Sequence, residues 1–155
     1  MELTIVLVVS AILVFFLVRS FAPKEAIALQ QAERLRDDLR HVQMLAMTWN
    51  QTLRITVTPA AGPVPARYSV ACATAGPTPP CNASPVVDPA TGRPFQVDLE
   101  SGLDLSGPGF TLDLDTLGRP KNGAALAANA NFDVTGGGTP RRVTVIQLTG
   151  FVTSP

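Results

Sequence analysis

The first part of the chain is an uninterrupted apolar segment. Residues 3–18, with the sequence LTIVLVVSAILVFFLV, carry no charge and only two polar side chains, Thr4 and Ser10. A helix of that length measures roughly 24 Å, which approaches the ~30 Å hydrocarbon layer of a bilayer. A removable signal peptide is the alternative, but no basic residue precedes the segment and no small-residue cleavage motif follows it. We therefore predict a transmembrane helix over residues 1–22.

An amphipathic helix is predicted next, over residues 23–50. No Gly or Pro interrupts the sequence from Lys24 to Asn50, and apolar residues recur there at spacings of three and four, which places them on one helix face. This apolar stripe consists of Leu29, Ala32, Leu35, Leu39, Val42 and Ala46. The opposite, polar face consists of Gln31, Glu33, Arg34, Asp37, Asp38 and His41. A coiled coil is the alternative, but the stripe is short and rich in alanine, so we expect the rest of the chain to cover it.

The remaining residues, 51–155, alternate between apolar and polar positions in short runs that are typical of half-buried strands. The predicted strands are Thr52–Thr58, Arg67–Cys72, Phe95–Leu99, Phe110–Asp115, Asn131–Thr135 and Arg142–Leu148. All 12 Gly and all but one of the 14 Pro lie in this part of the chain, where they form turns between strands. The prediction is an α+β fold, in which a long N-terminal helix packs through its amphipathic half on a C-terminal antiparallel β-sheet head.

The composition excludes one class of partner. The 155 residues carry 12 Lys+Arg and 12 Asp+Glu, and the predicted head, residues 51–155, is balanced as well. A general polyanion binder depends on an excess of basic side chains that neutralise phosphates. A histone-like role is therefore excluded.

The two cysteines, Cys72 and Cys81, flank a loop rich in Pro and Gly, ATAGPTPP. This spacing suits a disulfide formed in an oxidising compartment. A structural zinc site is the alternative, but it needs four ligands, and the sequence offers two Cys and the distant His41. We therefore predict a disulfide. The prediction conflicts with Arg19 and Lys24, which follow the apolar segment and by the positive-inside rule would place the head in the cytoplasm.

An acidic residue, Glu2, stands at the edge of the apolar segment. A carboxylate is costly in lipid and by default marks a functional pairing, although an interfacial residue without a role is the alternative. The segment MELTIVLVVSAILVFFLVRS resembles the N-terminus of type IV pilins and type II secretion pseudopilins, in which a basic leader ending in Gly precedes a glutamate and an apolar run. Glu2 corresponds to that glutamate. The resemblance implies a leader before Met1, its removal by a prepilin peptidase and N-methylation of the mature chain, and such a leader would resolve the conflict over topology.

A second resemblance covers nearly the whole chain, from Glu2 to Val152. The stretch RLRDDLRHVQMLAMTWNQTLRITVT, a helix that ends near Trp49 and Asn50 before a strand, resembles the H-type (GspH/FimT) minor pseudopilins and, more closely, the minor pilins of mannose-sensitive haemagglutinin (MSHA) type pili. It implies a structural subunit of a type IV pilus or a type II secretion pseudopilus, whose apolar helix also forms the filament core. The implied partners are other pilins or pseudopilins, an inner-membrane assembly platform, the prepilin peptidase and inner-membrane lipid. The implied location is the bacterial inner membrane, with a single pass and a periplasmic head, and then the filament at the cell surface.

Two other functions stay open. Some minor pilins related to this family bind DNA in natural transformation through basic residues near the end of the head. The corresponding candidates here are Arg119, Lys121, Arg141 and Arg142. The balanced charge of the head and the lack of aromatic residues among these candidates argue against DNA as a partner. The other open function is that of a membrane-tethered periplasmic β-domain with an unrelated ligand.

We expect neither enzymatic activity nor a cofactor. The motifs GxSxG, HExxH and GxxxxGK[ST] do not occur in the sequence. His41 falls on the polar helix face, where we expect it to be solvated. Asp113 and Asp115 lie two positions apart on a predicted strand, so we interpret them as a pair of surface carboxylates, too few for a calcium site.

Overall fold

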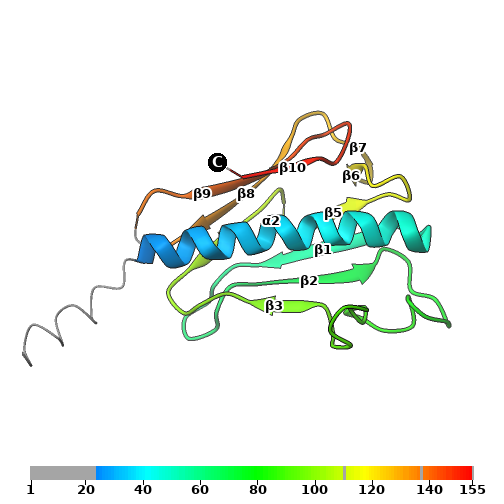
Figure 1. The fold of residues 1–155 in the computed structure, drawn as a ribbon, viewed down its shortest axis with the longest axis horizontal. Helices are drawn as coiled ribbons and strands as arrows, with labels where there is room; N and C mark the ends of the chain where they lie inside the picture. The colour runs from blue at the N-terminus through cyan, green and yellow to red at the C-terminus, as the bar shows by residue number, and fades with distance from the viewer. Residues whose placement is uncertain (1–23, 110, 137, 155) are drawn as a thin grey trace, which may run out of the picture.

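The computed structural model describes residues 24–109, 111–136 and 138–154, which form one helix and ten strands (Figure 1). Within these residues no helix is both long and apolar enough to cross a bilayer. The predicted transmembrane helix, residues 1–22, lies outside the described part of the chain.

Helix α2 (Lys24–Trp49) has 26 residues and ends close to the predicted position. Asn50 has a left-handed backbone conformation with φ of 52°. The backbone N–H groups of Asn50 and Gln51 donate hydrogen bonds to the carbonyls of Met47 and Ala46, respectively, so that the last carbonyls of the helix are satisfied. Asparagine tolerates the left-handed conformation better than most residues do, which explains why α2 ends here.

One face of α2 is buried, as the apolar stripe predicts. The buried residues of the helix are Ala28, Ala32, Leu35, Leu39, Val42, Leu45 and Ala46. The prediction is wrong at Leu29, which is 40% exposed. Leu29 and Leu35 are six positions apart, which places them about 120° apart around the axis of an α-helix. Leu29 therefore cannot share the buried face with Leu35. Ala28 takes its place.

Two antiparallel sheets form the head (Figure 1). The six-stranded sheet, in the order β3-β2-β1-β5-β6-β7, consists of β1 (Leu53–Thr58), β2 (Arg67–Cys72), β3 (Gln96–Asp98), β5 (Thr111–Leu114), β6 (Pro120–Asn122) and β7 (Ala124–Ala125). The four-stranded sheet, in the order β10-β9-β8-β4, consists of β4 (Asp104–Ser106), β8 (Ala130–Thr135), β9 (Arg141–Val145) and β10 (Val152–Thr153). Strands at the outer edges have only two or three residues, so most of the strand pairing lies in the centre of each sheet.

Each of the six predicted strands coincides with an observed one, with small shifts at the ends. The largest difference is in β9, which ends at Val145 rather than Leu148 because the chain turns into β10 there: the N–H of Gly150 bonds to the carbonyl of Ile146. Strands β4, β6, β7 and β10 were not predicted, because each has only two or three residues and lies close to Gly or Pro residues that indicate turns.

Apolar side chains from the helix and both sheets merge into one core, which extends from Ala28 to Val152. Strand β1 shows the alternation clearly, because Leu53, Ile55 and Val57 are at most 3% exposed while the intervening residues face outward. Helix α2 lies against β8, β9 and β10 and against β5, and Figure 1 shows it running along the length of the head. The head covers the apolar stripe, as predicted.

Candidate assembly site

Helix α2 is tied to the two turns that connect β5 to β6 and β9 to β10. The side-chain amide of Gln43 donates one hydrogen bond to the carbonyl of Gly118 and another to that of Thr149, each 3.0 Å long. The two turns meet here, since a Cβ atom on Gly150 would overlap the carbonyl oxygen of Gly118. Both glycines also have a positive φ, 73° for Gly118 and 70° for Gly150, which strains other residues. This junction therefore depends on glycine at both positions.

The same side of α2 holds the C-terminal strand. The guanidinium of Arg40 donates to the carbonyl of Val152 from Nη2 at 2.8 Å and from Nε at 3.3 Å. Its carbon Cζ lies 5.6 Å from the centre of the Phe151 ring, within the range of a cation–π interaction. Arg40 thus fixes β10 to the helix.

A partly buried polar contact ties the other side of α2 to β2. The hydroxyl of Tyr68 donates a hydrogen bond to the carboxylate of Asp38. Burial raises the pKa of Asp38, and the bond from Tyr68 and the charge of Arg34 offset this only in part. Burial also raises the pKa of Tyr68, and the negative charge of Asp38 adds to the effect, so the hydroxyl keeps its proton and remains a donor. Asp38 is therefore not part of a simply solvated face, contrary to the prediction.

The second polar contact on this side involves His41, whose Nε2 lies 3.1 Å from Oδ1 of Asp88. Asp88 also accepts hydrogen bonds from the backbone N–H of Ala90 at 3.0 Å and the hydroxyl of Thr91 at 2.9 Å. Partial burial acts to raise the pKa of Asp88, but these bonds and His41 outweigh it and lower the pKa below its usual value. The prediction of a solvated His41 is wrong, because this side chain fixes the loop between β2 and β3 to the helix.

A cleft of about 450 Å³ opens between α2 and the segment that leads into β3. It is lined by Arg34, Asp38, Asp88, Thr91, Arg93, Pro94, Phe95, Gln96 and Val97. Its two carboxylates are already bonded to Tyr68 and His41. The two carboxylates of the cleft therefore hold structural elements together.

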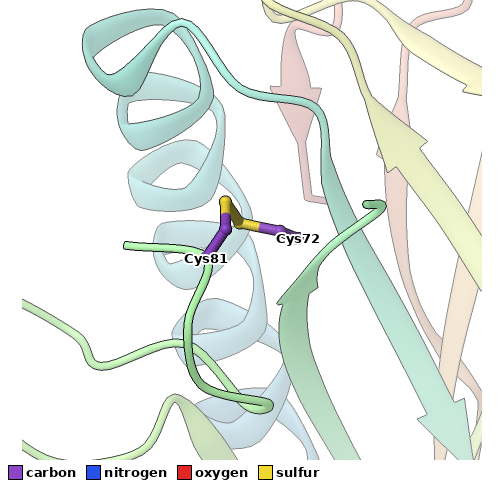
Figure 2. Close-up of a disulfide and its surroundings, with 2 residues drawn as sticks. All are labelled: Cys72 and Cys81. Carbon is purple, nitrogen blue, oxygen red and sulfur yellow. A yellow bond between two sulfur atoms is a disulfide. The ribbon is translucent and has the colours of Figure 1, made fainter. Parts of the chain in front are cut away.

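The structure joins Cys72 and Cys81 in a disulfide, with their Cα atoms 5.4 Å apart (Figure 2). Cys72 is the last residue of β2, and Cys81 lies on the following loop, where it is 8% exposed. The backbone N–H of Gly76 donates to the carbonyl of Cys81 at 2.9 Å, so a hydrogen bond also closes this loop. The disulfide fits the oxidising compartment that the sequence indicates.

We expect the double replacement Cys72→Ser and Cys81→Ser to lower the free energy of unfolding by about 2.5 to 3 kcal/mol, because the disulfide closes a loop of about ten residues in the unfolded chain. Urea denaturation of a fragment that begins at Lys24, and so contains the whole described core, measures the difference. As a control, the wild-type fragment in reducing buffer should match the double variant. Equal stability of the oxidised wild type and the variant would contradict the prediction.

The four basic candidates for DNA binding lie in two separate places. They are Arg119, Lys121, Arg141 and Arg142. Arg119 is the last residue of the β5–β6 turn that Gln43 contacts, and Lys121 lies on β6 just after it. The second pair begins β9, just after Gly138, which lies against Glu25 in the first turn of α2. About 18 helical residues, or roughly 27 Å, separate Glu25 from Gln43, so the two pairs do not form one compact basic surface.

Two of these four arginine and lysine side chains are also paired with carboxylates. Nη2 of Arg119 lies 2.9 Å from Asp115, and Nε of Arg142 lies 2.8 Å from Asp133. Partial burial acts to raise the pKa of Asp115, but hydrogen bonds from the backbone and side chain of Arg119 lower it overall. These ion pairs reduce the positive charge that a phosphate backbone would meet.

The interpretation of Asp113 and Asp115 as two similar surface carboxylates is wrong. Asp113 is 7% exposed, on β5, and accepts two hydrogen bonds from Arg54 of the neighbouring strand β1, at 2.7 and 2.9 Å. Asp115 lies beyond the end of β5 and caps the next turn by accepting from the backbone of Leu117 and Arg119. Each carboxylate thus has a separate structural role.

An exposed apolar patch, which was not predicted from the sequence, surrounds the junction at Gln43. The patch consists of Met44, Met47, Leu117, Leu148 and Phe151, which are between 48% and 70% exposed. The two methionines lie on α2, and the other three residues lie on the β5–β6 and β9–β10 turns at the end of the sheets near the C-terminal end of α2 (Figure 1). The described residues include eight large hydrophobic side chains that are exposed, and five of them are in this patch.

The head and helix together have the fold of minor pilins and minor pseudopilins. The crystal structure of the type IV minor pilin FimU from Pseudomonas aeruginosa matches with a TM-score of 0.54 and 13% sequence identity, over 82% of this chain and 87% of that chain. The minor pseudopilin EpsH from the type 2 secretion system of Vibrio cholerae matches with a TM-score of 0.50 and 14% identity, over 83% of this chain and 95% of that chain. The sequence matches no protein-family model and no curated protein. The predicted resemblance to minor pilins and minor pseudopilins is thus confirmed in the fold, and the closer resemblance to MSHA-type minor pilins stays a prediction.

Proposed function

We propose that this chain is a minor pilin or minor pseudopilin, a subunit of a type IV pilus or a type II secretion pseudopilus. The observation that carries the proposal is the order of its parts: Glu2, the apolar residues 3–18, and then α2 covered by a β-head. The fold similarity to FimU, a type IV minor pilin, and EpsH, a minor pseudopilin of the type 2 secretion system, supports it. The sequence pattern favours an MSHA-type pilus as the filament.

In this proposal the apolar residues 3–18 hold the precursor in the inner membrane. After the prepilin peptidase removes the leader, an assembly platform in that membrane transfers the subunit to the filament, where the apolar segment packs among those of its neighbours. Glu2 then pairs with the N-terminal amine of an adjacent subunit. Because an unpaired carboxylate is expensive at low dielectric, this pair sets the position of the subunit.

The head contributes contacts with other subunits rather than catalysis. Its polar side chains at α2 are used to hold β2, the β2–β3 loop and β10 in place. The placement and ion pairing of the basic residues give the DNA-binding alternative no support. The proposed location is the inner membrane, with the head in the periplasm, where the disulfide would form.

We expect Glu2→Leu, made in the full-length precursor, to leave the amount of protein in the membrane unchanged and to reduce its incorporation into filaments by about tenfold or more. A lost pairing energy of 1.4 kcal/mol already corresponds to a factor of ten. Filaments sheared from cells, compared with the membrane fraction by quantitative mass spectrometry, give the incorporated fraction. Glu25→Leu is the matched control, because Glu25 is exposed in the first turn of α2, and it should be incorporated normally.

The same experiment separates two failures. Normal incorporation of the Glu2 variant would remove the role assigned to that carboxylate. Absence of the wild-type chain from filaments would overturn the proposed function itself and favour a membrane-tethered domain.

A further inference from the structure

We propose that the apolar patch on the head docks another pilin-like subunit, one that presents aliphatic side chains with an Asp or Glu among them. The inference rests on the proposed function and adds the surface and the chemistry of the contact. The patch is the set defined above: Met44, Met47, Leu117, Leu148 and Phe151.

The patch is held as one surface. Residues 40, 43, 44 and 47 follow the helical spacing of three and four, so Met44 and Met47 lie on the same side of α2 as Arg40 and Gln43. Gln43 is bonded to both turns that carry the remaining patch residues. An apolar surface assembled from three segments and fixed at its centre by hydrogen bonds is typical of an interaction site.

The charge at the patch indicates what the partner carries. Arg40 lies over the Phe151 ring and binds the carbonyl of Val152, but none of the ion pairs found in the described residues includes it. Covering the patch would remove water from this cation, which is costly unless the partner supplies a carboxylate. A partner with an acidic side chain among its apolar contacts meets that requirement.

Two other occupants fit less well. A second copy that docks through the same patch would bring two Arg40 side chains together without a carboxylate between them, which is unfavourable at low dielectric. A bilayer is the other candidate, but Met44 lies about 30 Å along α2 from Lys24, where the N-terminal segment joins the helix. A different subunit, beside this one in a filament, is the occupant that the charge and position favour.

Photo-crosslinking in cells that assemble the filament tests the proposal on the full chain. A photoreactive amino acid replaces Leu148, which is 70% exposed and therefore tolerates replacement. We expect a covalent adduct with a different pilin-like subunit, mapped by mass spectrometry to a peptide with an Asp or Glu near the crosslink. A photoreactive residue at Val64, exposed on the distant β1–β2 connection, should not give this adduct.

Two charge variants make the test specific. Arg40→Gln should reduce the adduct by about thirtyfold or more, the usual effect of losing one partner of a buried charge pair. Arg34→Gln removes an exposed charge on another side of α2 and should leave the adduct unchanged. An intact disulfide in each variant shows that the head has folded. The inference would be overturned by the absence of an adduct, or by an adduct with lipid, with a second copy or with an unrelated protein. An adduct that Arg40→Gln leaves unchanged would overturn it as well.

Filament incorporation, measured in the same cells, distinguishes this inference from the proposed function. If the chain enters filaments and Leu148 gives no adduct, the docking surface is wrong and the function stands. If the chain is absent from filaments, the proposed function is wrong and this inference falls with it.

Discussion

Replacing Leu35 by alanine is expected to lower the free energy of unfolding by about 2 to 5 kcal/mol, the usual cost of emptying a buried leucine site. Leu35 is 1% exposed, in the middle of the buried face of α2. The loss has two parts, the transfer of the apolar side chain and the cavity that remains where α2 meets the sheets. This helix covers the core, so its neighbours cannot close the cavity without moving other elements.

Leu29 is the matched control, since it is the same residue type on the same helix but is 40% exposed. Leu29→Ala should change the stability by less than about 0.5 kcal/mol, as surface substitutions usually do, and alanine is at least as good a helix former. Urea denaturation of the fragment that begins at Lys24 measures both variants. Equal losses would mean that both leucines are buried, and that α2 is rotated relative to the position described above.

The sequence was sufficient for the architecture because the signals for it are local. Each of the six predicted strands alternates over several residues, and the end of α2 follows from Asn50, which can adopt the left-handed conformation. The disulfide was predictable for the same reason, since Cys72 and Cys81 are only nine positions apart. Within α2, the assignment of Leu29 to the buried stripe was wrong, because the helical phase places Ala28 on that face instead.

The interactions at the candidate site were not predictable in this way. Asp38 and Tyr68 are 30 positions apart, and His41 and Asp88 are 47 apart. Asp38 and His41 fall on the polar face of the helix, which was interpreted as solvated, and only the packing of β2 and the following loop on α2 brings each of them to its partner. A long-range contact between two polar residues leaves no periodic pattern in one sequence.

The apolar patch escaped prediction for a related reason. Leu148 was placed inside a strand, where a hydrophobic residue would face the core, but β9 ends before it and the residue lies on an exposed turn. Whether a hydrophobic residue in a turn is buried depends on what packs against that turn. The position of α2 leaves the side chains of Leu117 and Phe151 more than half exposed.

Replacing Phe132 by alanine is expected to have the largest effect on the head, a loss of about 3 to 5 kcal/mol in the free energy of unfolding. Phe132 lies on β8, is 1% exposed and is the largest fully buried side chain of the described residues. Its ring is packed so closely that a Cβ atom added to Gly107 would lie 3.0 Å from it and 3.3 Å from Val57 of the other sheet. The ring therefore fills the space where the two sheets meet.

Phe151→Ala is the control for this variant, because Phe151 is 56% exposed and its known partner is the Arg40 guanidinium. A cation–π pair at an exposed site contributes about 0.5 to 1 kcal/mol, so the head should remain folded. Urea denaturation of both fragments gives the two losses. Similar losses would mean that Phe132 does not join the sheets. The expected result, a large loss for Phe132 and a small one for Phe151, would separate the ring that builds the head from the ring that remains available to a partner.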